Sequence, residues 1–285
     1  MTEMEPAIRL TAFLGVFVAV ALWEALAPRR ATTYSRAQRW PHNLGLVALN
    51  SVLVRLLVPG AAIAVAVAGE TRGWGLINAL GLSGAPAVLL ALVLLDLAIY
   101  FQHVMFHAVP TLWRLHRVHH SDIEFDLTTG TRFHPIEILL STLIKMAAVV
   151  AIGAPAIAVL VFEVLLNATS MFNHANARLP AAFDRRLRLL VVTPDMHRVH
   201  HSVDYNETNS NFGFNVPWWD RLFGTYRAQP AAGHDAMTLG VDAFRTRADL
   251  RLDRLLLQPF RDTPGGYAIN RRPNPPHSER KGNRA

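Results

Sequence analysis

The hexapeptide HRVHHS occurs twice in this chain, at residues 116–121 and again at residues 197–202. On an α-helix, positions i, i+3 and i+4 lie within an arc of roughly 100°. Each copy, called here a histidine motif, therefore places three imidazoles on one helical face. These are His116, His119 and His120 in the first motif and His197, His200 and His201 in the second. A surface helix needs no such repeat, so the two motifs predict a metal centre.

Further histidines lie near the two motifs. His103 and His107 have the i, i+4 spacing by which two imidazoles on one helical face bind one ion. Single histidines follow at His134, in RFHPIE, and at His174, in FNHAN. Of the 13 histidines only His42, His234 and His277 lie outside residues 103–201, which leaves ten candidates. One transition-metal ion takes roughly four to six ligands, so ten imidazoles predict two ions.

The ligand type limits the choice of metal. Imidazole suits iron, copper, zinc and nickel, whereas thiolate-bound clusters are excluded because the chain has no cysteine. A dinuclear hydrolase or a soluble di-iron carboxylate protein would normally show bridging carboxylates and Glu-x-x-His pairs. Glu-x-x-His does not occur in this sequence. We therefore expect two iron ions in a nitrogen shell, with zinc as the second choice.

The composition indicates an integral membrane protein, because 51% of the residues are hydrophobic and only 17% are charged. Apolar stretches cover about residues 8–27, 43–69, 78–101, 136–151 and 154–172. The last two are short and are separated by Gly153 and Pro155, which favours a helical hairpin over two tilted crossings. We predict an all-α membrane protein with about three transmembrane helices plus this hairpin. A cytosolic helical cap would carry the metal site.

Arginines predict the orientation in the membrane. The loop after the first apolar stretch holds Arg29, Arg30, Arg36 and Arg39 and no acidic residue, which places it in the cytoplasm by the positive-inside rule. The first helix is expected to be retained with its amino terminus outside, and the active site to face the cytoplasm of a bacterial inner membrane. The formal charge of +7 reflects cationic residues beside membrane segments and in the tail after about residue 262. That tail is expected to be disordered, and the partners to be anionic lipids rather than nucleic acid.

Two carboxylates are candidates for tuning the metal ligands. Asp96 lies seven residues before His103 on the same helical face, in an apolar run where a charge is costly. We expect it to accept a hydrogen bond from a ligand imidazole, the alternative being that it only reaches water. Asp195 either does the same or caps the helix of the second motif. Lys145 and Glu163 are expected to pair across the hairpin.

Aromatic residues are concentrated in residues 209–226. Trp218, Trp219, Phe223 and Tyr226 suit either a membrane-interface belt or a cap over the metal site. We favour packing at the membrane interface.

The series HVMFH, HRVHHS, RFHPIE, NHAN, DMHRVHHS and WWDRLFGTY resembles the fatty acid hydroxylase or sterol desaturase superfamily of membrane di-iron oxygenases. The resemblance covers about residues 91–226, leaving residues 1–90 as amino-terminal membrane helices and residues 227–285 as a carboxyl-terminal extension. It implies that His103, His107 and the six motif histidines are ligands and that His174 matches the isolated family histidine. Some members have a second histidine at the position of Ser170, so His134 is the candidate for the tenth ligand.

The resemblance also implies an activity. Two iron ions would activate O2 and hydroxylate an unactivated C–H bond of a lipid, such as a sterol or a fatty acyl chain. The chain shows no flavin fingerprint, haem-binding domain or iron–sulfur cysteines, so a separate reductase, ferredoxin or cytochrome would supply electrons. Desaturation at the same centre is the first alternative. A metal carrier or transporter is the second, but its ligands would lie near the bilayer midplane.

Overall fold

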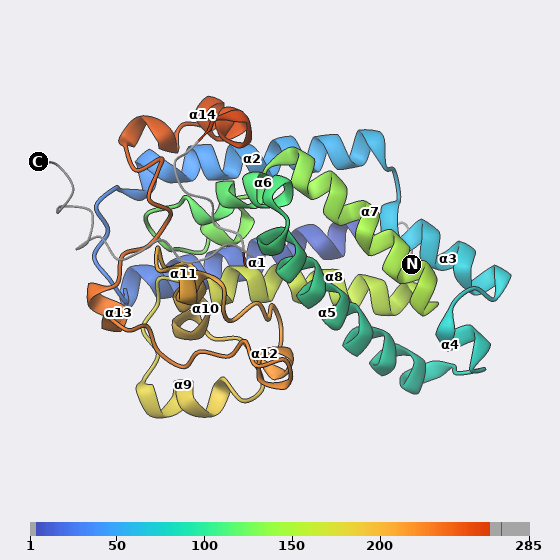
Figure 1. The fold of residues 1–285 in the computed structure, drawn as a ribbon. Coiled ribbons are helices and arrows are strands. Elements are labelled where there is room, and N and C mark those ends of the chain that lie inside the picture. Colours follow the sequence, from blue (N-terminus) through green and yellow to red (C-terminus); the bar gives the residue numbers. More distant parts are fainter. Residues whose placement is uncertain (1–3, 263–268, 270–285) are drawn as a thin grey trace, which may run out of the picture.

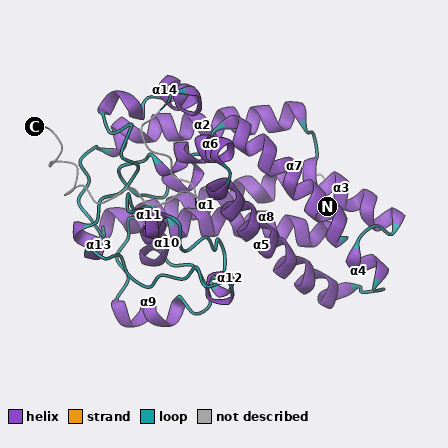
Figure 2. Cartoon of the chain, viewed as in Figure 1, coloured by secondary structure: helices purple, strands orange, loops and turns teal. Residues whose placement is uncertain are grey.

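The computed structural model describes residues 4–262 and residue 269, and within these residues the fold is all-helical (Figure 2). The described residues contain no strand, only two isolated β-bridges, Pro28 with Ala177 and Ser202 with Leu239. The predicted all-α class is therefore confirmed. The disorder predicted after about residue 262 falls on residues that lie outside those described, apart from Ile269.

Five helical segments are long and apolar enough to cross a membrane: α1 (Glu5–Leu26), the run from α2 to α4 (Arg36–Ala79), α5 (Gly84–Ala108), α7 (Pro135–Ile152) and α8 (Ala156–Asn173). The outward face of α1 shows the pattern well. Leu14, Val18 and Leu22 recur at i+4 spacing and are all exposed, which is the arrangement expected of a lipid-facing row. The chain is thus an integral membrane protein.

The apolar stretch at residues 43–69 is not one helix, as its length had suggested. It divides into α2 (Arg36–Leu57) and α3 (Ala61–Arg72), with a short α4 (Leu76–Ala79) after them. The break falls at Pro59 and Gly60. Proline lacks the amide hydrogen that a continuing helix needs, and Gly60 takes a φ of 72°, which favours glycine.

Helices α7 and α8 are joined by a turn at Gly153, and each has 18 residues, about 27 Å at 1.5 Å per residue. Each is long and apolar enough to cross a membrane, so a hairpin that returns on one side stays a prediction beside two crossings. The turn at Gly153 packs against residues 74–78, where an added Cβ on Gly75 would lie 2.2 Å from the Gly153 nitrogen. The turn therefore lies beside the α3–α5 connection. Lys145 pairs with Glu163 across the hairpin, as expected, and Arg9 of α1 joins the pair.

Short helices form a cap at the opposite end of the membrane helices (Figure 1). They are α6 (Pro110–His120), η1 (Thr129–Thr131), α9 (Ala181–Leu187), α10 (Pro194–His200), α11 (Tyr205–Thr208), α12 (Trp218–Leu222), α13 (Gly233–Ala236), η2 (Arg247–Leu250), α14 (Leu252–Leu257) and η3 (Gln258–Phe260). The two histidine motifs end α6 and α10, so the predicted helical setting of both motifs is confirmed.

Candidate metal centre

Nine of the ten candidate histidines gather into two buried groups. The five-histidine group consists of His103, His107, His116, His120 and His200, and the four-histidine group of His119, His174, His197 and His201. Within each group, one ring nitrogen of every residue lies within 4.8 Å of the others. Each histidine motif contributes to both groups, because neighbouring residues on a helix point about 100° apart.

The nitrogen positions in the four-histidine group suit a metal ion. Nε2 of His174 lies 3.2 Å from Nε2 of His119 and 3.1 Å from Nε2 of His197 and of His201. One imidazole nitrogen cannot form ordinary hydrogen bonds with three others at once. An ion roughly 2.0–2.1 Å from each nitrogen would place neighbouring nitrogens about 3.0–3.4 Å apart, as observed.

The five-histidine group shows the same kind of convergence. Nε2 of His107 lies 3.2 Å from Nε2 of His120. The Nε2 atoms of His103, His116 and His200 are buried and have no hydrogen-bond partner among the described residues. Buried polar atoms without partners are costly, and ligation of an ion would satisfy them.

Backbone carbonyls orient several of these rings. Nδ1 of His103 donates to the Phe212 carbonyl at 2.8 Å, Nδ1 of His119 to Thr129 at 3.0 Å, and Nδ1 of His200 to Ser210 at 2.7 Å. A proton on Nδ1 leaves the Nε2 lone pair free for a metal. Burial also lowers the pKa of His116 and His174 to about 3, so both are neutral near pH 7.

The two groups adjoin one another within aromatic walls. The His120 and His201 rings stack with centroids 4.4 Å apart. Phe133 stacks on His119 at 4.5 Å, and Phe125 lies 5.3 Å from His174. Two ions held here would therefore be close to each other and shielded from water.

Glu137 is a site residue that the sequence reasoning missed. Its Oε1 accepts a hydrogen bond from Nδ1 of His116 at 2.6 Å, and both side chains are buried. Glu137 lies in the first turn of α7, within the same RFHPIE segment from which only His134 was selected. A carboxylate at the start of an apolar helix was the available signal, and it is the argument that had been applied to Asp96.

His134 lies outside both groups. It caps α7, where its Nδ1 accepts a hydrogen bond from the Ile136 amide at 3.2 Å, and its Nε2 lies 3.2 Å from the Leu256 carbonyl. Ser170, the position of the family's further histidine, is buried beside His174 and accepts the hydrogen bond from its Nδ1 through the backbone carbonyl. The structure thus brings together nine histidines and not ten.

Asp96 and Asp195 have partners other than the predicted imidazoles. Asp96 accepts hydrogen bonds from Nδ2 of Asn215 at 2.7 Å and from Nε1 of Trp219 at 2.8 Å. Trp219 therefore connects residues 209–226, where the aromatic residues are concentrated, to α5. Trp218 is exposed. Asp195 pairs with Arg198 and Arg29, and Thr193 rather than Asp195 caps α10.

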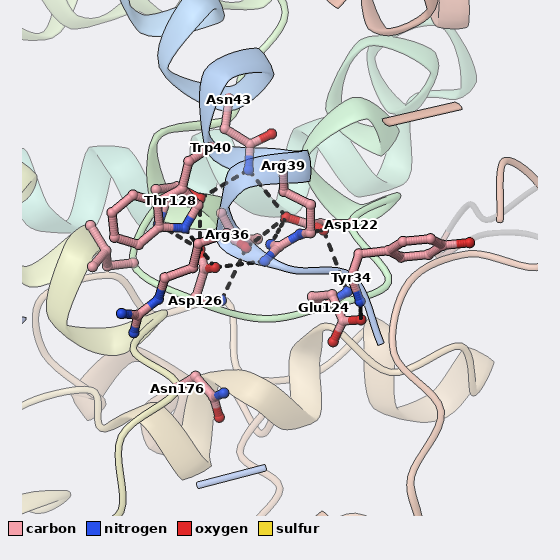
Figure 3. Close-up of polar contacts among 12 residues, drawn as sticks. Tyr34, Arg36, Arg39, Trp40, Asn43, Asp122, Glu124, Asp126, Thr128 and Asn176 are labelled. Atoms are coloured by element: carbon pink, nitrogen blue, oxygen red, sulfur yellow. Dashed lines mark hydrogen bonds and ion pairs between the residues drawn. The ribbon is translucent and has the colours of Figure 1, made fainter. Parts of the chain in front are cut away.

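A buried ion network anchors the loop that follows the first motif (Figure 3). Arg39 of α2 donates to Asp122 through Nε at 3.1 Å and Nη2 at 2.6 Å, and to Asp126 through Nη1 at 2.6 Å. Asp122 also accepts from Thr129 Oγ1 at 2.8 Å. Because the Thr129 carbonyl orients His119, α2 is connected to the four-histidine group through this loop.

The network affects the pKa of Asp122 and shows that Arg39 has a structural role. Burial alone would raise the pKa of Asp122, but Arg39 and Arg132 outweigh it and lower that pKa to about 2. Arg39, counted above as a loop arginine, is instead a helical residue with 1% of its surface exposed. Arg36 likewise pairs with Glu24. The arginines that predicted the orientation are therefore partly engaged in structural ion pairs.

Comparisons with known proteins agree with this site. Residues 88–225 match the family model described as fatty acid hydroxylase. The matched residues, just under half of the chain, are thus similar to this family. The match includes all nine grouped histidines and Glu137, and it confirms the resemblance seen in the sequence.

Several curated relatives are similar to this chain. Ornithine lipid hydroxylase OlsE of Rhizobium tropici is 32% identical over 50% of this chain and 42% of its own length. Alkylglycerol monooxygenase of Homo sapiens is 29% identical over 47% and 29%, and cholesterol 25-hydroxylase of Rattus norvegicus is 28% identical over 50% and 47%. The chain thus spans less than half the length of these relatives. No solved structure matches it significantly.

Proposed function

We propose that this chain is a membrane-bound oxygenase that uses two iron ions and O2 to hydroxylate an unactivated C–H bond of a lipid. The observation that carries the proposal is the division of both histidine motifs between two adjoining groups. Neither motif alone could complete a group, and the two groups together offer nine imidazoles. Nitrogen ligands without thiolates suit iron, with zinc as the second choice.

The two ions would supply the redox chemistry, placing one oxygen atom of O2 in the C–H bond and reducing the other to water. This balance requires two electrons and two protons, and a separate reductase, ferredoxin or cytochrome would provide the electrons. The chain's own residues hold the ligand nitrogens in place and exclude water. The Phe212, Thr129 and Ser210 carbonyls fix the ring tautomers, and Phe125 and Phe133 cover the four-histidine group.

A lipid substrate is supported by the membrane helices and by the relatives. The three relatives are named for an ornithine lipid, alkylglycerol and cholesterol, and each name is that of a hydroxylase or monooxygenase. Hydroxylation is therefore proposed ahead of desaturation. The site would face the cytoplasm, where soluble electron donors are available.

Single-histidine variants test the two-ion proposal. His119 and His120 are neighbours that belong to different groups, so His119→Ala and His120→Ala should each lower bound iron and abolish incorporation of labelled oxygen from 18O2 into membrane lipids. His42→Ala is the control, because His42 belongs to neither group. Metal content is measured on purified full-length protein, and the unfolding temperature and size-exclusion profile of the same samples separate loss of iron from misfolding. Two ions retained in both His119→Ala and His120→Ala would refute the proposal.

A further inference from the structure

A polar pocket with a volume of about 270 Å³ lies beside the four-histidine group and is separate from it. Residues 30–33, 123–125 and 236–239 form most of its wall. Phe125, which also lines the pocket, is 3% exposed, and its ring lies 5.3 Å from that of His174 and 5.1 Å from that of His201. Phe125 thus lines the pocket and also contacts the four-histidine group.

Two arginines in the pocket wall lack ion pairs. Nη2 of Arg30 donates to the Met237 carbonyl at 3.0 Å, whereas its Nη1 is buried with no partner among the described residues. Nη1 of Arg245 donates to the carbonyls of Leu239 and Val241, each at 2.9 Å. The described residues offer neither arginine a carboxylate within ion-pair distance. By contrast, the neighbouring Arg29 pairs with both Asp195 and Asp235.

Asn176 holds the backbone of Arg30 in place. The Arg30 amide donates to Oδ1 of Asn176 at 3.0 Å, and the Arg30 carbonyl accepts from Nδ2 of Asn176 at 2.9 Å. Burial lowers the pKa of Arg30, and the carboxylates of Asp235 and Glu124, which form no ion pair with it, offset this only in part, so the charge is incompletely compensated. A bound anion would complete that compensation without rearranging the loop.

One carboxylate also lines the pocket, and it does not cancel the two cations. Oε1 of Glu124 accepts hydrogen bonds from the amides of Thr33 at 2.6 Å and Tyr34 at 3.0 Å, which disperses its charge (Figure 3). Two guanidinium groups against one such carboxylate leave the pocket with a net positive charge.

The pocket also lies where membrane helices end. Part of its wall comes from the loop between α1 and α2 and from Asn176, just beyond the end of α8. Helices that span the apolar layer end at the level of the lipid headgroups. The volume is slightly below the roughly 300–1,000 Å³ of pockets that enclose drug-sized ligands, so it suits a headgroup and not a whole lipid.

We propose that this pocket binds an anionic oxygen group, a phosphate or a carboxylate, with Arg30 and Arg245 as its cationic partners. Arg30 would bind the anion through its unpartnered Nη1. The position at the helix ends makes a lipid headgroup the expected source, and free phosphate is the other source of the same chemistry. The proposal does not depend on the oxygenase activity.

Lipid retention and phosphate binding test the pocket in the full-length protein. In micelles containing equal amounts of phosphatidylglycerol and phosphatidylcholine, native mass spectrometry should show preferential retention of phosphatidylglycerol. Arg30→Gln combined with Arg245→Gln should weaken that retention at least about tenfold, the loss expected for charge-assisted hydrogen bonds. Arg178→Gln is the matched control, because Arg178 is an exposed arginine on a nearby loop that does not line the pocket.

Inorganic phosphate distinguishes the two sources. If phosphate raises the unfolding temperature of wild-type protein in phosphatidylcholine nanodiscs but not that of the double variant, and phosphatidylglycerol is not preferred, the ligand is a free anion. Unchanged metal content shows that the double variant is folded. If it does not fold, Arg245→Gln alone should give an intermediate loss. Retention of neither anion by wild-type protein, or equal retention by the arginine variants, would overturn the proposal.

Discussion

At the scale of single residues, Glu137 is the one carboxylate that the described part of the chain places against a histidine of the two groups. Its hydrogen bond to His116 fixes the ring orientation and increases the basicity of Nε2, the nitrogen that faces the five-histidine group. Asp96, by contrast, holds Asn215 and Trp219. The two buried carboxylates therefore act on different parts of the site.

Glu137→Gln should lower metal affinity or oxygenase activity by about 10–100-fold, the usual effect of removing the partner of a ligand histidine. Glutamine keeps the shape and one acceptor, so the protein should still insert in the membrane. Asp96→Asn is the comparison, and it should reduce activity while the protein keeps both ions. Iron content and turnover of the two variants would be measured side by side. Equal iron affinity together with equal turnover in Glu137→Gln and wild-type protein would contradict the assigned role.

His134 provides a second prediction at this scale. Because it caps α7 and lies outside both groups, His134→Ala should keep both ions and lose only stability, about 0.5–2 kcal/mol for a helix cap. His174→Ala should instead lose metal from the four-histidine group. The metal content of the two variants shows whether His134 binds an ion. Loss of an ion from His134→Ala would show that His134 is a ligand.

At the scale of elements, α2 holds the loop between α6 and α7 by way of buried charges. Arg39 reaches both Asp122 and Asp126, and Trp40 Nε1 adds a hydrogen bond to Asp126 at 3.0 Å. Removing one member of a buried ion network leaves charges without compensation, which costs more than the network contributes when intact. The loop in turn carries the Thr129 carbonyl that orients His119.

Arg39→Leu should therefore destabilise the protein by about 3–5 kcal/mol. Arg36→Leu is a control on the same helix, because Arg36 is partly exposed in its pairing with Glu24 and should have a smaller effect. The apparent unfolding temperature in one detergent gives the comparison. An equal decrease in the unfolding temperature of both variants would show that the Arg39 network stabilises the protein no more than the Arg36 pair does.

At the scale of the whole molecule, residues after the family match, which ends at residue 225, pack against the helix that carries the first histidine motif. Arg117 of α6 donates to the carbonyl of Gln258, and Leu255 packs with Leu46 of α2 and Val118 of α6. These contacts join the carboxyl-terminal residues to the first histidine motif. The cap and the membrane helices thus form one connected structure, with the histidines where they meet.

The cytoplasmic orientation of the cap stays a prediction, and the absence of cysteine makes it easy to test. Ser83→Cys introduces a thiol at the end of the bundle opposite the cap, and Ala182→Cys introduces one in the cap, and both positions are exposed. In intact cells, a membrane-impermeant thiol reagent should label Ser83→Cys alone. In inverted vesicles it should label Ala182→Cys alone. The reverse pattern would place the cap outside.

The sequence by itself determined the features that depend on local periodicity and composition. Helical spacing fixes which histidines share a face, and apolar length fixes which helices can cross a bilayer, so the helical setting of both motifs and the apolar helices were predictable. Tertiary structure alone decided how the histidines are divided. His119 and His120 join different groups because adjacent helical positions diverge and meet different neighbours.

The partners of Glu137 and Arg39 were also decided by packing. Glu137 meets His116 and Arg39 meets Asp122 across 21 and 83 positions of the chain, and no local pattern specifies which distant segment a side chain will face. For His134, in contrast, a local feature of the sequence determined its role. Its neighbour Pro135 starts a helix and made it a cap, while the histidines that it resembled in sequence were carried into the centre by α5, α6, α8 and α10.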